Sequence, residues 1–118
     1  MYTNLERINM ERYNITHDYL LEGTKDLTPF DIVYLKHNWK QFKSCQVWYC
    51  DCKVTNKNTG ELLNGYILQS YGTYACLYIP RENLVIRLKY STTTSKQITQ
   101  WLKQMHCINP ETVYFYSR

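Results

Sequence analysis

The sequence of 118 residues lacks any apolar run that approaches the ~20 residues a membrane-spanning helix needs. Its first residues, MYTNLERINMERYN, are polar and mixed in charge, so they do not resemble the apolar core of a signal peptide. The cysteines are odd in number and lack the spacing of a disulfide framework: Cys45, Cys50, Cys52, Cys76 and Cys107. These absences predict a cytoplasmic protein with reduced thiols.

Motifs for catalysis and metal binding are also missing. No G-x-S-x-G or S-x-x-K motif occurs, and no base is evident for Ser95. A zinc site could be assembled from Cys50, Cys52, Cys76, His106 and Cys107. However, residues i and i+2 of a strand lie ~6.5–7 Å apart, which is wide for two ligands of a tetrahedral site. We interpret the cysteines as small core residues and predict no enzymatic activity, metal or cofactor.

Acidic residues are scarce after the first quarter of the chain. The net charge is +4, but residues 1–31 hold six acidic against three basic residues, whereas residues 32–118 hold 11 basic against four acidic residues. This basic segment could meet an acidic partner such as RNA, DNA or an acidic protein. It could equally be complemented by the acidic N-terminal segment, and the sequence does not choose between the two.

The stretch LTPFDIVYLKHNWKQF (27–42) has the pattern of a helix. Thr28 can cap a helix, and Pro29 fits its first position. Apolar residues then recur on one helical face, at Ile32, Leu35, Trp39 and Phe42. The β-branched pair at 32–33 leaves a strand as the alternative. We predict a helical N-terminal segment (1–44) within a single domain (1–118), because no linker or repeat divides the chain.

The rest of the chain alternates as strands do. Strands are expected over 45–55, over 62–79 as one bent strand or two, over 84–90, and over 112–117. A helix is expected over 94–107, where Ile98, Trp101, Leu102 and Met105 form an apolar stripe. The predicted fold is α+β with two layers, an antiparallel sheet of about four strands with helices packed on one face.

The start of that helix, YSTTTSKQ, allows two interpretations. Thr94 and Gln97 fit a capping box, in which each side chain bonds the other's backbone amide. Hydroxyls at a helix start, with Lys96 adding charge, could instead hold a phosphate. The glycines that let a backbone wrap a phosphate are missing, so the spacing favours the cap.

Basic and aromatic residues are interleaved in the predicted sheet and helix. Tyrosine is abundant, with 12 residues against three Phe and three Trp, as expected of strands or of a binding face. The candidate contact residues are Arg81, Arg87, Lys89, Lys96, Lys103, Tyr71, Tyr74 and Tyr78. Such residues suit single-stranded nucleic acid, because charge meets phosphates and rings stack on bases. The alternative is an ordinary solvated face of the sheet.

Residues 66–102 resemble a family of small uncharacterised proteins carried by phages and plasmids of Gram-positive bacteria. The shared pattern, S-Y-x-T followed by two strands and S-x-T-T-S-K before a helix, is formed here by Ser70, Tyr71, Thr73, Tyr90, Ser91, Thr93, Thr94, Ser95, Lys96, Ile98, Trp101 and Leu102. The resemblance covers about a third of the chain and brings no catalytic residues. It implies a mobile-element context, in which small proteins often bind and block a host machine, including CRISPR nucleases.

We therefore expect a non-enzymatic binding protein in the cytoplasm of a bacterial host. It would dock on a host protein or ribonucleoprotein and inhibit antiviral defence in the manner of an anti-CRISPR protein. The alternative is a small basic protein that binds RNA or DNA in phage or plasmid replication or regulation. No membrane partner is expected.

Overall fold

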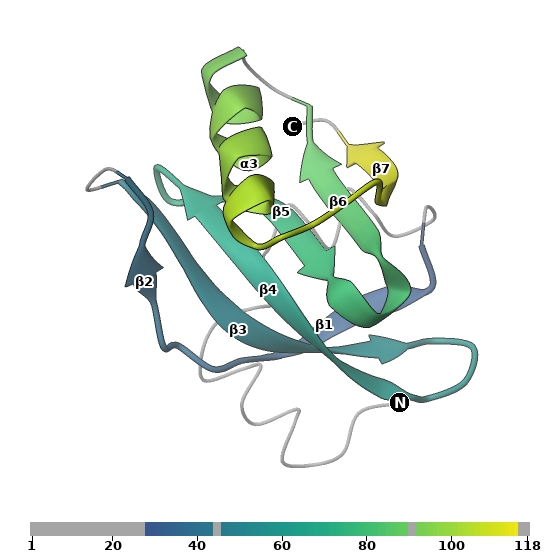
Figure 1. The fold of residues 1–118 in the computed structure, drawn as a ribbon. Helices are drawn as coiled ribbons and strands as arrows, with labels where there is room; N and C mark the ends of the chain where they lie inside the picture. Colours follow the sequence, from purple (N-terminus) through teal and green to yellow (C-terminus); the bar gives the residue numbers. More distant parts are fainter. Residues whose placement is uncertain (1–27, 44–45, 90–91, 116–118) are drawn as a thin grey trace.

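The structure, a computed structural model, describes residues 28–43, 46–89 and 92–115. These ranges form seven strands, one α-helix and one short 3-10 helix (Figure 1). In chain order the elements are β1 (Phe30–Leu35), β2 (Lys40–Gln41), β3 (Val47–Asn56), β4 (Leu62–Ser70), β5 (Thr73–Ile79), η2 (Pro80–Glu82), β6 (Leu84–Leu88), α3 (Thr92–Gln104) and β7 (Glu111–Phe115). No helix among them is long and apolar enough to cross a membrane.

The strands form one sheet in the order β1-β3-β4-β5-β6-β7. The short strand β2 pairs with β3 beyond the end of β1. All pairs are antiparallel except β6 and β7, which run parallel because α3 connects them as a crossover. The sheet curls strongly, so that β1 runs across the face opposite α3 (Figure 1).

Each face of the sheet has its own core. The core on the β1 face gathers side chains from β1, β3, β4, β5 and β6, with Ile32, Ile67 and Ile86 fully buried. The second core lies between the sheet and α3, where Trp101 and Ile98 are fully buried against Leu68 and Val85. Burial on both faces explains why β6 reads as an almost continuous apolar run.

The predicted fold class is wrong in two respects. The described residues hold seven strands rather than about four, and a single α-helix rather than several covers one face. The sheet is also not wholly antiparallel, since β7 joins it in parallel with β6. The described part of the chain is therefore mainly a β structure, and β1 and the curl of the sheet cover the face for which further helices were expected.

The helix expected over 27–42 is wrong, because this segment forms β1 and β2. The register between β1 and β3 shifts between Ile32 and Tyr34, which marks a bulge. A bulge changes the phase of side-chain alternation, so Ile32 and Leu35 both reach the same core three residues apart. A spacing of three residues between core side chains is also the pattern of a helix, which explains the wrong prediction. Residues 1–27 of the expected helical N-terminal segment lie outside the described residues.

The helix expected over 94–107 is confirmed with shifted ends, Thr92 to Gln104. Thr94 and Gln97 therefore lie inside the helix, and the predicted capping box is wrong. The side chain of Gln97 instead accepts a hydrogen bond from the hydroxyl of Ser70 on β4, at 2.9 Å. This bond joins the first turns of α3 to the sheet.

Most other strand predictions are confirmed. β3 alternates as expected, with Cys50, Cys52 and Val54 buried on one face. The long run over 62–79 divides into β4 and β5 at a turn where Gly72 has φ +80°, a conformation that favours glycine. Val85 lies on the same face of β6 as Arg87 and is buried beneath α3. This face of β6 therefore lines the second core, beneath α3.

Candidate binding surface

The polar outer face of α3 follows from the way the helix packs. Ile98, Trp101 and Leu102 are buried against the sheet. Side chains on the opposite side of the helix therefore point to solvent, and those of Thr92, Lys96, Gln100 and Lys103 are among the exposed ones. We call these four residues the outer face of α3. They border a shallow, open depression of about 350 Å³ together with Ser95 and Thr99.

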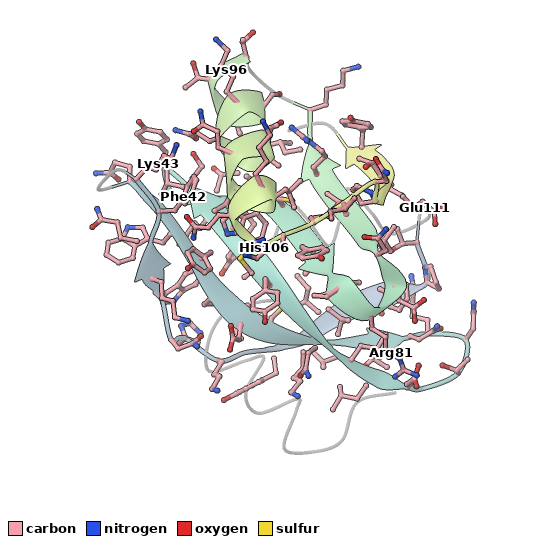
Figure 2. The ribbon with its side chains drawn as sticks, in the orientation of Figure 1. Phe42, Lys43, Arg81, Lys96, His106 and Glu111 are labelled. Carbon is pink, nitrogen blue, oxygen red and sulfur yellow. The ribbon has the colours of Figure 1, made fainter. Side chains whose placement is uncertain are left out.

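A first flank of α3 is formed by the end of β2. Lys43 is exposed, and its Nζ donates a hydrogen bond to Oε1 of Gln100 at 3.1 Å. Figure 2 shows Phe42 and Lys43 beside the helix, with Lys96 at the far tip of α3. The contact brings a cation from residue 43 to the outer face of α3, 57 residues further along the chain.

The second flank of α3 is formed by β6 and β7. Nη2 of Arg87 donates hydrogen bonds to the Ser95 carbonyl at 3.0 Å and to Oγ1 of Thr99 at 3.3 Å. The guanidinium carbon of Arg87 and Nζ of Lys89 lie 5.8 and 5.7 Å from the ring centre of Tyr114. Tyr114 is half exposed and accepts both cations on its ring.

Tyr71 lies in the turn between β4 and β5, directly after Ser70, whose hydroxyl bonds Gln97 of α3. Its backbone amide donates to the carbonyl of Gln46 at 2.8 Å, which places the turn beside the β2–β3 connection. Its side chain is 65% exposed, and its φ is +51°. An exposed ring held on a tight turn is available for contact with another molecule.

Charge is segregated along the molecule. The described acidic residues are Asp31, Asp51, Glu61, Glu82 and Glu111, and none lies on α3 or at the strand ends beside its first turn. Two of them form ion pairs, Asp31 with Lys57 at 4.0 Å and Glu61 with Arg81 at 2.9 Å. We use the name basic end for the surface of Lys43, Tyr71, Lys89, Lys96, Lys103 and Tyr114. The described residues supply no acidic group to it.

The structure brings some of the predicted contact residues together and separates others. Lys89, Lys96, Lys103 and Tyr71 belong to the basic end. Arg87 is only partly exposed and holds α3 in place. Arg81 lies at the opposite end of the molecule from Lys96 (Figure 2).

The other two predicted tyrosines are not on this surface. Tyr74 is half-buried against the core on the β1 face. Tyr78 is only 6% exposed and stacks on Tyr66 with ring centres 6.4 Å apart. Sequence reasoning missed Lys43 and Tyr114. Strict alternation along β7 could have indicated the exposure of Tyr114, but only the fold brings Lys43 to α3.

The described cysteines are free thiols in apolar surroundings. Burial raises the pKa of Cys50 to about 12 and also raises the pKa of the fully buried Cys76. Burial raises the pKa of Cys107 as well, although its hydrogen bond with Tyr78 works in the opposite direction. Within the described ranges, no three His, Cys, Asp or Glu side chains are placed to hold a metal ion.

Residues 28–43, 46–89 and 92–115 thus form a curled sheet with one crossover helix and a basic surface on one side. The family model for DUF8033, a family of unknown function, matches residues 35–114. This match covers about two thirds of the chain, from the end of β1 into β7, so the chain belongs to the DUF8033 family. Comparison with curated proteins and with solved structures gave no match.

Proposed function

We propose that this protein is a non-enzymatic binding protein of a mobile genetic element, and that its basic end docks on an acidic surface of a host protein or ribonucleoprotein. The observation that carries the proposal is the gathering of exposed lysines around α3, to which the described residues add no acidic side chain. Unpaired charge of one sign steers an oppositely charged partner and sets its orientation. Exposed Tyr71 and Tyr114 add contact area beside the lysines.

The resemblance of residues 66–102 to phage and plasmid proteins supports the mobile-element context. Within that context, we propose that docking inhibits antiviral defence, as an anti-CRISPR protein does, in the cytoplasm of a bacterial host. The free thiols of the described cysteines fit such a reducing compartment. Raised pKa values leave Cys50 and Cys76 protonated near neutral pH, which supports a role in packing rather than in nucleophilic chemistry.

Affinity capture from bacterial lysate tests the docking proposal. The wild-type chain is compared with Lys43→Gln/Lys96→Gln/Lys103→Gln and with the control Lys36→Gln/Lys53→Gln/Arg81→Gln, which removes the same charge elsewhere. We expect a saturable partner that the first variant loses and the control retains. Nuclease treatment of the lysate distinguishes a ribonucleoprotein from a protein. Equal capture by both variants would refute docking through the basic end.

A second candidate function is direct nucleic-acid binding, as expected of a small basic protein of replication or regulation. The observation that favours it is the composition of the outer face of α3, which offers hydroxyl, amide and ammonium groups only. Binding through four lysines should give a slope of log K against log salt of about −3 to −4 for duplex DNA. Fluorescence anisotropy over a salt series measures this slope, and the absence of salt-dependent binding would exclude the function.

A further inference from the structure

The outer face of α3 differs from the centre of a typical protein–protein interface. Such centres are built on buried apolar or aromatic anchors. Thr92, Lys96, Gln100 and Lys103 supply none, and the exposed rings of Tyr71 and Tyr114 lie off the helix. Interfaces with nucleic acid are instead polar and positively charged. The polar, cationic chemistry of this face is that of a nucleic-acid contact, which supports the second candidate function.

Cations lie on both sides of α3. Lys43 reaches Gln100 from the β2 side. Lys89 lies on the β6–β7 side, where its neighbour Arg87 is hydrogen-bonded to Ser95 and Thr99 of the helix. A duplex presents two phosphate strands, one on each border of its major groove, so a polar helix flanked by cations on both sides complements a groove rather than a single strand.

The size of α3 agrees with this arrangement. A helix of 13 residues is about 20 Å long and, with side chains, about 10–12 Å wide. The major groove of B-form DNA is about 12 Å wide and admits one helix, whereas the corresponding groove of duplex RNA is too deep and narrow. Lysine and glutamine are side chains that bond guanine and adenine edges there.

We infer that α3 is a groove-binding helix for duplex DNA. Lys96, Gln100 and Lys103 face the base edges, and Lys43 and Lys89 contact the phosphates on the two borders of the groove. Arg87 is a positioning residue that fixes the height of α3 above the sheet. The inference rests on the nucleic-acid function proposed above, and it specifies duplex DNA as the ligand and α3 as the element that contacts it.

Anisotropy titrations of the full chain with a 20-base-pair DNA duplex, its single strand, the duplex RNA of the same sequence, and poly-glutamate test the inference. We expect the DNA duplex to bind at least tenfold more tightly than the other three. Lys43→Gln or Lys89→Gln should each reduce the salt slope by about 1 and weaken all duplex sequences alike. Gln100→Ala should change the ranking of duplexes that differ in sequence, by roughly fivefold or more at a contacted position.

Arg81→Gln serves as the matched control, because it removes a cation at the opposite end and should leave duplex affinity within twofold. Melting curves confirm that each variant is folded. Absence of binding to any nucleic acid would overturn both the inference and the second candidate function. Equal affinity for single strands, or salt-dependent duplex binding that Gln100→Ala leaves unchanged for every sequence, would overturn the groove-binding helix alone. Preference for poly-glutamate would assign the surface to an acidic protein.

Discussion

Arg87 illustrates, at the scale of a single residue, why a basic side chain is not always a contact for a partner. Its guanidinium spans from β6 to α3 through two hydrogen bonds and lies over the ring of Tyr114. Lys89, two residues later, is exposed, and its Nζ lies over the same ring. The sequence assigned both residues the same role, because alternation along a strand places them on one face and does not indicate what covers it.

The two residues should therefore respond differently to substitution. Arg87→Ala removes the hydrogen bonds that fix α3 and should lower the free energy of unfolding by about 1.5–3 kcal/mol. Lys89→Ala should change it by less than about 0.5 kcal/mol, as an exposed site. Urea denaturation followed by circular dichroism measures both values. Equal losses would show that Arg87 does not hold the helix in place.

Buried thiols predict a pH dependence of stability. Burial raises the pKa of Cys50 to about 12 and raises that of Cys76, so the folded protein keeps both protons at pH values where the unfolded chain, with thiol pKa near 8.5, releases them. The contribution of these two thiols to the free energy of unfolding is fully present below the pKa of the unfolded thiols, about 8.5, and is lost as the pH rises above it. Each thiol should contribute a decrease of up to about 1.4 kcal/mol per pH unit above 9.

Denaturation at pH 7.5, 8.5 and 9.5 measures this decrease. The double variant Cys50→Ala/Cys76→Ala is the control, and its stability should fall less steeply between the two higher values, whatever its stability at pH 7.5. A decrease of the same steepness in the variant would show that other groups, such as tyrosines, cause the loss.

At the scale of elements, the comparison of β1 with α3 shows what a sequence pattern can predict. The apolar stripe of α3 has one interpretation, because Ile98, Trp101, Leu102 and Met105 keep a helical period and do not alternate as the residues of a strand would. In β1, the bulge after Ile32 produces the same three-residue spacing in a strand. The pairing of β1 with β3, which comes later in the chain, decides between a helix and a strand for this segment. Local propensity does not predict that pairing.

The first turn of α3 lacks an acidic residue, although acidic side chains stabilise helix N-termini. Thr92→Glu should raise the free energy of unfolding by about 0.5–1 kcal/mol, because it complements the dipole and pairs with Lys96 four residues later. The same change should weaken binding of a polyanion, because it neutralises part of the basic end. Thr92→Gln controls for helix propensity, and melting curves with anisotropy measure both effects. If the variant gains stability and keeps its affinity for the polyanion, Lys96 does not contact the polyanion.

At the scale of the whole molecule, folding distributes a modest net charge unevenly over the surface. Lys43, Lys89, Lys96 and Lys103 are separated by up to 60 residues in the sequence, and the curl of the sheet with the crossover of α3 brings Lys43 and Lys89 to the two sides of the helix that carries the other two. The sequence predicted the excess of positive charge after residue 31 and several of the lysines. It could not predict that the described acidic residues lie elsewhere, since that separation depends on the order of strands in the sheet.

Two variants of equal net charge isolate this distribution. Lys43→Gln/Lys96→Gln/Lys103→Gln removes three charges from the basic end, and Lys36→Gln/Lys53→Gln/Arg81→Gln removes three charges elsewhere. If the basic end acts as one surface, the first variant should elute from immobilised heparin at much lower salt than the second, because each lost phosphate-like contact reduces the salt slope by about 0.9. Elution of the two variants at the same salt concentration would mean that net charge alone determines the affinity for polyanions, and the basic end would then have no role as a docking surface.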